Sequence, residues 1–189
     1  MLDPLTAELA YREAAAAREH VRAIQRAIKF PLRLLSTADL AGAVVVLLIG
    51  RFHLLAYFAP AYLGVLVASG WWYRRYATRH GLLLPVRPWV LILVATLAAG
   101  ASMSRLGVAL EEPWISDFGP CLALAVGTAL TAWWLRSRRL ALTASAMLAS
   151  TAVVSLAADG DVAVALQLAA FGFLLWSASL ATSDHQDRP

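Results

Sequence analysis

Two adjacent carboxyl groups are the feature of this sequence with the clearest chemical use. Glu111 and Glu112 lie at a predicted membrane boundary, and Pro113 follows them directly. A carboxyl group in apolar surroundings keeps its proton and can act as an acid, while the nearby ring of Trp114 or Phe118 can face a cation. Pro113 disfavours helical geometry at Glu112, which makes Glu111 the better candidate for a buried acid. The pair predicts, as one hypothesis, a catalytic site that protonates a lipid or an isoprenoid.

A second set of polar residues could bind a substrate. These residues fall at the same boundary or inside an apolar segment, and they are Arg51, His53, Arg105 and Gln167. Polar and ionisable groups within a membrane are costly, so each is a candidate for function. The competing interpretation is that the charged residues belong to ordinary wet loops and that Gln167 bonds a neighbouring helix.

The sequence offers little for a metal or a cofactor. Its four histidines, His20, His53, His80 and His185, all lie away from the middle of any apolar segment. The single cysteine, Cys121, excludes an intramolecular disulfide and a thiolate metal cluster. No motif of a zinc protease, a serine hydrolase or a phosphate-binding loop occurs. We therefore expect no metal and no cofactor, and the sequence favours a protein that is not an enzyme.

The elements that would position these residues are membrane helices. The chain of 189 residues is 60% hydrophobic and 15% charged, whereas soluble domains are about 45–50% apolar and about 25% charged. Crossing a bilayer takes about 20 mostly apolar residues, and only helices or closed barrels satisfy their backbone there. The segments that fit are 34–50, 53–73, 88–105, 118–135, 140–157 and 162–181. The sequence therefore predicts an all-α, polytopic bundle of six transmembrane helices.

The basic residues predict the orientation of this bundle. Of the 16 Lys and Arg residues, all but Arg51 and Arg105 fall on the side that also holds both termini. The positive-inside rule places that side in the cytoplasm. We therefore expect an integral protein of the plasma (cytoplasmic) membrane, the cell inner membrane, with both termini cytoplasmic. Because this topology accounts for the arginines, we expect no nucleic-acid partner.

Aromatic residues follow the same pattern. "WWYRR" at 71–75 and "WWLRSRR" at 133–139 each join two tryptophans to an arginine cluster. Indole rings prefer the headgroup level of a membrane, so both stretches indicate a helix that leaves the bilayer into the cytoplasm. The residues predicted at this interface are Trp71, Trp72, Trp89, Trp133, Trp134, Arg22, Arg26 and Lys29.

An amphipathic helix is predicted before the first span, over residues 1–33. Pro4 suits its first turn and Pro31 ends it, while Ser36 and Asp39 resemble a capping box that opens the first span. With apolar residues on one face and charges on the other, this helix lies on the lipid surface or packs on a partner, and lipid is favoured. The chain is thus divided into the amphipathic segment, a transmembrane domain over 34–181 and a short cytoplasmic tail over 182–189.

Three classes of function fit these observations. The preferred one is a non-enzymatic membrane protein, namely an accessory, anchor or signalling subunit that acts through helix packing and its amphipathic helix. Its partners would be the lipid bilayer and either another protein or a second copy of the chain. Short loops and the lack of catalytic motifs favour this class.

Two alternatives remain. One is a small-solute transporter or a substrate-binding membrane component. In size and span number alone, the chain resembles the substrate-capture subunits of energy-coupling-factor importers, although its long amino-terminal helix departs from them. The other alternative is a membrane enzyme that acts on a lipid or an isoprenoid through an outer-facing carboxylate at Glu111 or Glu112.

Overall fold

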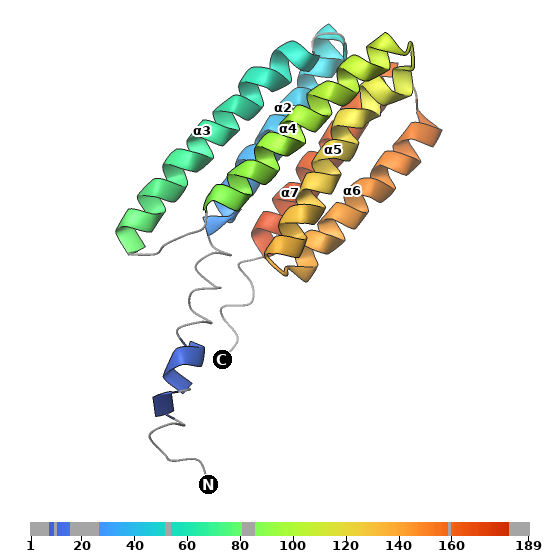
Figure 1. The fold of residues 1–189 in the computed structure, drawn as a ribbon. Coiled ribbons are helices and arrows are strands. Elements are labelled where there is room, and N and C mark those ends of the chain that lie inside the picture. Colours follow the sequence, from blue (N-terminus) through green and yellow to red (C-terminus); the bar gives the residue numbers. More distant parts are fainter. Residues whose placement is uncertain are drawn as a thin grey trace.

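The computed structural model describes residues 8–9, 11–15, 27–51, 54–80, 86–158 and 160–181. These residues are almost entirely helical and contain no strand, which confirms the all-α prediction (Figure 1). The long helices are α2 (Lys29–Ile49), α3 (Leu54–His80), α4 (Val86–Ala109), α5 (Pro113–Trp134), α6 (Arg138–Ala157) and α7 (Gly160–Ala181).

Five of these helices are long and apolar enough to cross a membrane. They are α2, α4, α5, α6 and α7. Helix α3 is the longest of the bundle, with 27 residues, and Pro60 lies inside it. The prediction of a multi-pass membrane protein is therefore supported by five helices, whereas the sixth span stays a prediction.

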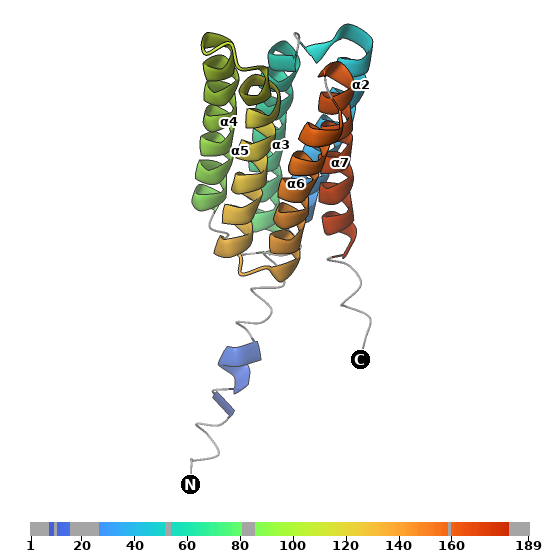
Figure 2. The same cartoon turned by 90° about the vertical axis from the view of Figure 1, so that its right-hand side faces the viewer.

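The helices run alternately up and down in one bundle. Helices α2, α4 and α6 end where α3, α5 and α7 begin, which we call the Arg51 end (Figures 1 and 2). The opposite side is the Lys29 end, where α2 begins and α7 ends. The first and last of these helices, α2 and α7, pack against each other, as do α4 and α5.

Close approach between these helices depends on glycine. A Cβ atom added at Gly172 of α7 would lie 2.6 Å from Cγ of Leu40 in α2. A Cβ atom at Gly127 of α5 would overlap the side chain of Thr96 in α4. Small residues allow helices in a membrane to pack closely, where van der Waals contact replaces the hydrophobic effect as the driving force.

The start of α2 differs from the prediction. The helix begins at Lys29, so Pro31 lies in its first turn and does not end a preceding helix. Proline is tolerated there because the first backbone N–H groups of a helix have no partner within it. Asp39 lies in the middle of α2, and the predicted capping box at Ser36 is therefore wrong.

Little of the predicted amphipathic segment lies within the described residues. Residues 8–9 and 11–15 are helical and exposed, and Arg12 bonds Glu8 one turn earlier at 2.7 Å. Arg22 and Arg26 lie outside the described residues, as does the tail over 182–189. The amphipathic helix therefore stays a prediction.

Candidate functional site

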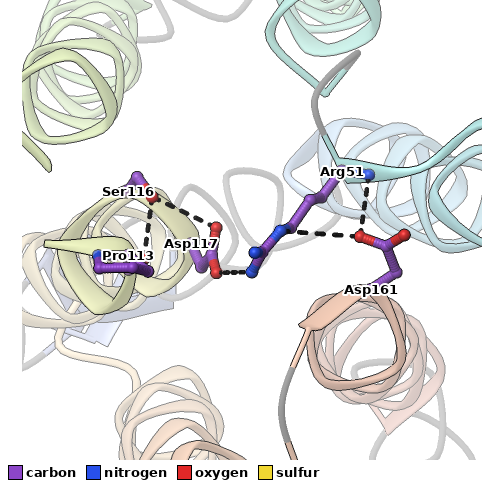
Figure 3. Close-up of polar contacts among 5 residues, drawn as sticks. All are labelled: Arg51, Pro113, Ser116, Asp117 and Asp161. Carbon is purple, nitrogen blue, oxygen red and sulfur yellow. Dashed lines mark hydrogen bonds and ion pairs between the residues drawn. The ribbon is translucent and has the colours of Figure 1, made fainter. Parts of the chain in front are cut away.

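Arg51 joins three helices at one end of the bundle. Its Nη1 atom bonds Oδ2 of Asp117 in α5, and its Nε atom lies 3.7 Å from Oδ1 of Asp161 in α7 (Figure 3). The backbone N–H of Arg51 also donates to Oδ1 of Asp161, at 3.2 Å. Arg51 thus links the connection after α2 to the amino-terminal half of α5 and to the first turn of α7.

Local backbone geometry directs these side chains toward each other. Gly50 ends α2 with a φ of 84°, a conformation that glycine adopts readily, and its N–H bonds the carbonyl of Val46. Asp161 lies in the first turn of α7, where the helix dipole favours a negative charge. The hydroxyl of Ser116 donates to the carbonyl of Pro113 at 2.8 Å and lies 3.3 Å from Oδ1 of Asp117.

The two carboxylates of this cluster differ in exposure. The side chain of Asp117 is 15% exposed and that of Asp161 is 48% exposed, while that of Arg51 is 26% exposed. Water screens the Asp161 contact more strongly, so we expect the Arg51–Asp117 contact to contribute most of the stabilisation. Chemically, the arrangement neutralises charge and cross-links helices.

The other predicted boundary residues do not join this cluster. Arg105, Glu111 and Glu112 are exposed, and within the described residues no ion pair connects Arg105 to either glutamate. His53 lies outside the described residues. The structure therefore pairs Arg51 with two aspartates that the sequence analysis did not consider as site residues.

Glu111 and Glu112 form the turn between α4 and α5. Glu111 has a φ of 57°, its N–H bonds the carbonyl of Val108, and the N–H of Glu112 bonds the carbonyl of Gly107. These two bonds define a Schellman motif that ends α4. Glu112 is extended and Pro113 opens α5, which confirms the expected loop at Glu112. A catalytic role for either carboxylate stays a prediction.

Gln167 bonds the neighbouring helix. It is fully buried in α7, and its Nε2 atom donates to Thr151 Oγ1 at 2.8 Å and to Ser150 Oγ at 3.2 Å, both in α6. This is the packing role that the sequence favours for it. Its role as a substrate-binding residue stays a prediction.

The tryptophans divide between the surface and the interior. Trp71 and Trp133 are exposed, and the guanidinium of Arg75 lies 5.0 Å from the ring centroid of Trp71. Trp89 is buried, and its ring makes an edge contact with the ring of Tyr73. The ring of Trp72 stacks on that of Phe30, with 4.6 Å between the ring centroids. Lys29 opens α2, and Trp134 is half-buried at the end of α5. The rings of Trp72 and Trp89 therefore pack against protein.

The sequence analysis missed one buried pair. Asp39 in α2 is fully buried, and the hydroxyl of Tyr62 in α3 donates to its Oδ1 atom at 2.6 Å. Its Oδ2 atom is buried and has no hydrogen-bond partner among the described residues. A lone acidic residue within the apolar stretch 34–50 was the signal. The capping interpretation assigned it to a helix end instead.

No protein family model, curated protein or solved structure matches this chain. Across the described residues, no group of three His, Cys, Asp or Glu side chains could hold a metal ion. The candidate features are therefore the Arg51–Asp117–Asp161 cluster at one end of the bundle and the Asp39–Tyr62 pair in its interior.

Proposed function

We propose that the chain is a non-enzymatic membrane protein, an accessory, anchor or signalling subunit that acts through helix packing and its amino-terminal segment. One observation carries this proposal. The charged residues Arg51, Asp117 and Asp161 bond to one another across three helices. Charged side chains that pair with one another stabilise the packing of the helices. This pairing favours a role in binding a partner over a role in catalysis.

A sixth span in α3 follows from the order of the helices. Helix α2 ends at the Arg51 end and α4 begins at the Lys29 end, and both are candidate spans. The chain between them must cross the same thickness of membrane. At about 1.5 Å per residue, the 27 residues of α3 are long enough for this. Pro60 is tolerated in such a helix because neighbouring helices compensate for the lost hydrogen bond.

The proposed orientation places the Lys29 end in the cytoplasm. Among the described residues of the bundle, the basic ones at this end are Lys29, Arg33, Arg74, Arg75, Arg79, Arg87, Arg136, Arg138 and Arg139. The Arg51 end has Arg51, which is paired with carboxylates, and Arg105. This asymmetry supports a protein of the plasma membrane, the cell inner membrane, with both termini in the cytoplasm.

Labelling of single cysteines tests the topology. In a Cys121→Ser background, Thr78→Cys places a thiol near the end of α3, and Glu112→Cys places one between α4 and α5; both positions are exposed. An impermeant maleimide added outside intact cells should label Glu112→Cys alone. Labelling of Thr78→Cys from outside would contradict the proposed topology.

A truncation tests the accessory role. Full-length protein and a variant lacking residues 1–26 are cross-linked in their native membranes and purified. We expect the full-length protein to retain a partner in fixed stoichiometry, and we expect the truncated protein to lose it at unchanged thermal stability. A partner retained by both proteins would rule out docking through the amino-terminal segment, and no partner with either would contradict the accessory role.

A further inference from the structure

The interior of the bundle contains a carboxyl group whose charge no cation among the described residues balances. Asp39 is at the midpoint of α2 and is fully buried. Arg51 lies roughly 18 Å further along the helix axis and is bonded to Asp117 and Asp161. Arg33 lies roughly 9 Å the other way, with its guanidinium 5.7 Å from the ring centroid of Trp176.

The groups that face Asp39 are neutral in their ordinary states. Helix α3 contributes Tyr62, which donates to Oδ1, and Tyr57, which donates to the adjacent carbonyl of Ala38 at 3.0 Å. Helix α5 contributes Cys121, which is buried within electrostatic reach of Asp39. Within α2 from 34 to 50 and α7 from 162 to 181, Asp39 is the only ionisable residue. A carboxylate here would be an uncompensated charge in apolar surroundings, which is strongly unfavourable.

We propose that Asp39 and Tyr62 form a proton-binding site in the membrane interior, which exchanges its proton with the Lys29 end of the bundle. Oδ2 of the carboxylate takes up one proton and becomes a neutral carboxylic acid, and release reverses this step. Tyr62 keeps its own proton and donates to Oδ1 in both states. Hard metal cations take about six to eight oxygen ligands. The side-chain oxygens described at this site are those of Asp39 and Tyr62, which suit a proton better than a metal ion.

Three further buried polar atoms have no hydrogen-bond partner among the described residues; Gln167 Oε1 lies on α7, and the other two, on α3, indicate the side of access. On α3, Ser69 Oγ and Trp72 Nε1 are buried and have no hydrogen-bond partner among the described residues. The spacing from Tyr62 to Ser69 and Trp72 places all three on one face of α3, in order toward the Lys29 end. Unpaired polar atoms of this kind can hold water that relays a proton. The site lies wholly within the bundle, so it does not depend on the accessory role proposed above.

Infrared difference spectroscopy on the full-length protein in lipid tests the site. Spectra recorded between acidic and alkaline pH should contain a carbonyl band of a protonated carboxyl group. This band should be missing in Asp39→Asn, which keeps the shape of the side chain and its bond to Tyr62. In Tyr62→Phe the band should persist to higher pH, because the carboxylate has lost a hydrogen bond. The absence of any band that depends on Asp39 across this range would overturn the proposal.

A second measurement tests the side of access. In vesicles of uniform orientation, the pH is changed on one side and the rate at which the Asp39 band responds is recorded. A change at the Lys29 end should act at least several-fold faster than one at the Arg51 end. Ser69→Ala should slow the response several-fold, while Ser177→Ala, an exposed serine near the same end, should leave it unchanged. A faster response from the Arg51 end would overturn the proposed access through Ser69.

Discussion

The hydroxyl of Ser36 donates a hydrogen bond to the backbone carbonyl of Gly172 at 2.7 Å, and this bond joins α2 to α7. Both residues are buried, and the missing side chain of Gly172 lets Leu40 of α2 lie against the α7 backbone. The first and last long helices of the bundle, α2 and α7, are therefore held together by buried contacts. Contacts of this kind, with small residues and a hydroxyl, are typical of stable membrane helix pairs.

Substitution of Gly172 should separate this helix pair. A Cβ atom there would lie 2.6 Å from Leu40 Cγ and 3.0 Å from the carbonyl of Ser36. We expect Gly172→Ala to lower the free energy of unfolding by about 1–3 kcal/mol, the usual effect of overpacking. Thermal unfolding in detergent measures this change. Gly64→Ala is the control, because a Cβ atom at Gly64 meets nothing within 4 Å; equal destabilisation by both would contradict the close contact.

The two partners of Arg51 should contribute unequally to stability. We expect Asp117→Asn to lower the free energy of unfolding by about 1–3 kcal/mol, because it removes a charged bond from a largely buried side chain. Asp161→Asn should change it by about 0–1 kcal/mol, because that side chain is 48% exposed. Unfolding curves of the single variants and of each double variant with Arg51→Gln give the coupling energies. A larger coupling to Asp161 would contradict this order.

The turn at Glu111 should become more stable with glycine. A side chain at a φ of 57° is strained by about 1 kcal/mol or more, so we expect Glu111→Gly to raise the unfolding temperature. Glu112→Gly, at a φ of −104°, should give no such gain. Glu111→Gln should leave stability unchanged. Loss of folding in Glu111→Gln would instead indicate a structural pairing of this carboxyl group.

Anionic lipid should protect the amino-terminal segment. If residues 1–26 form a helix on the membrane surface, their amide hydrogens should exchange more slowly in anionic nanodiscs than in neutral ones. Replacing both Arg22 and Arg26 with glutamate should remove this difference. Hydrogen exchange of the full-length protein, followed by mass spectrometry, measures it. Equal protection in both lipids would favour a protein partner over the lipid surface.

Apolar runs predict the bundle well because lipid imposes one simple requirement on them. Five of the six expected segments coincide, to within about one residue at each end, with helices long and apolar enough to cross a membrane or lie inside them, and the loop at Glu112 lies where Pro113 predicts it. The start of α2 was less predictable, because a proline either ends one helix or opens the next. At Pro31 it does the second.

Contacts between distant residues could not be predicted in the same way. The pairing of Arg51 with Asp117 and Asp161 depends on which connections meet at one end, and several acidic residues near that end were equally plausible from their positions in the chain. Asp39 was misassigned for a related reason. A capping role is a local property that a pattern suggests, whereas burial against Tyr62 is visible only once α2 and α3 are side by side.

The pairing of α2 with α7 has a consequence for biogenesis. The ribosome makes α2 first of these helices and α7 last, so the Ser36 face of α2 has to wait for its partner while the rest of the domain enters the bilayer. Until then, the hydroxyl that α7 later binds faces lipid or the insertion machinery. A nascent chain that stops before Gly160 should therefore be recognised by membrane proteases, because its first helix has no final neighbour.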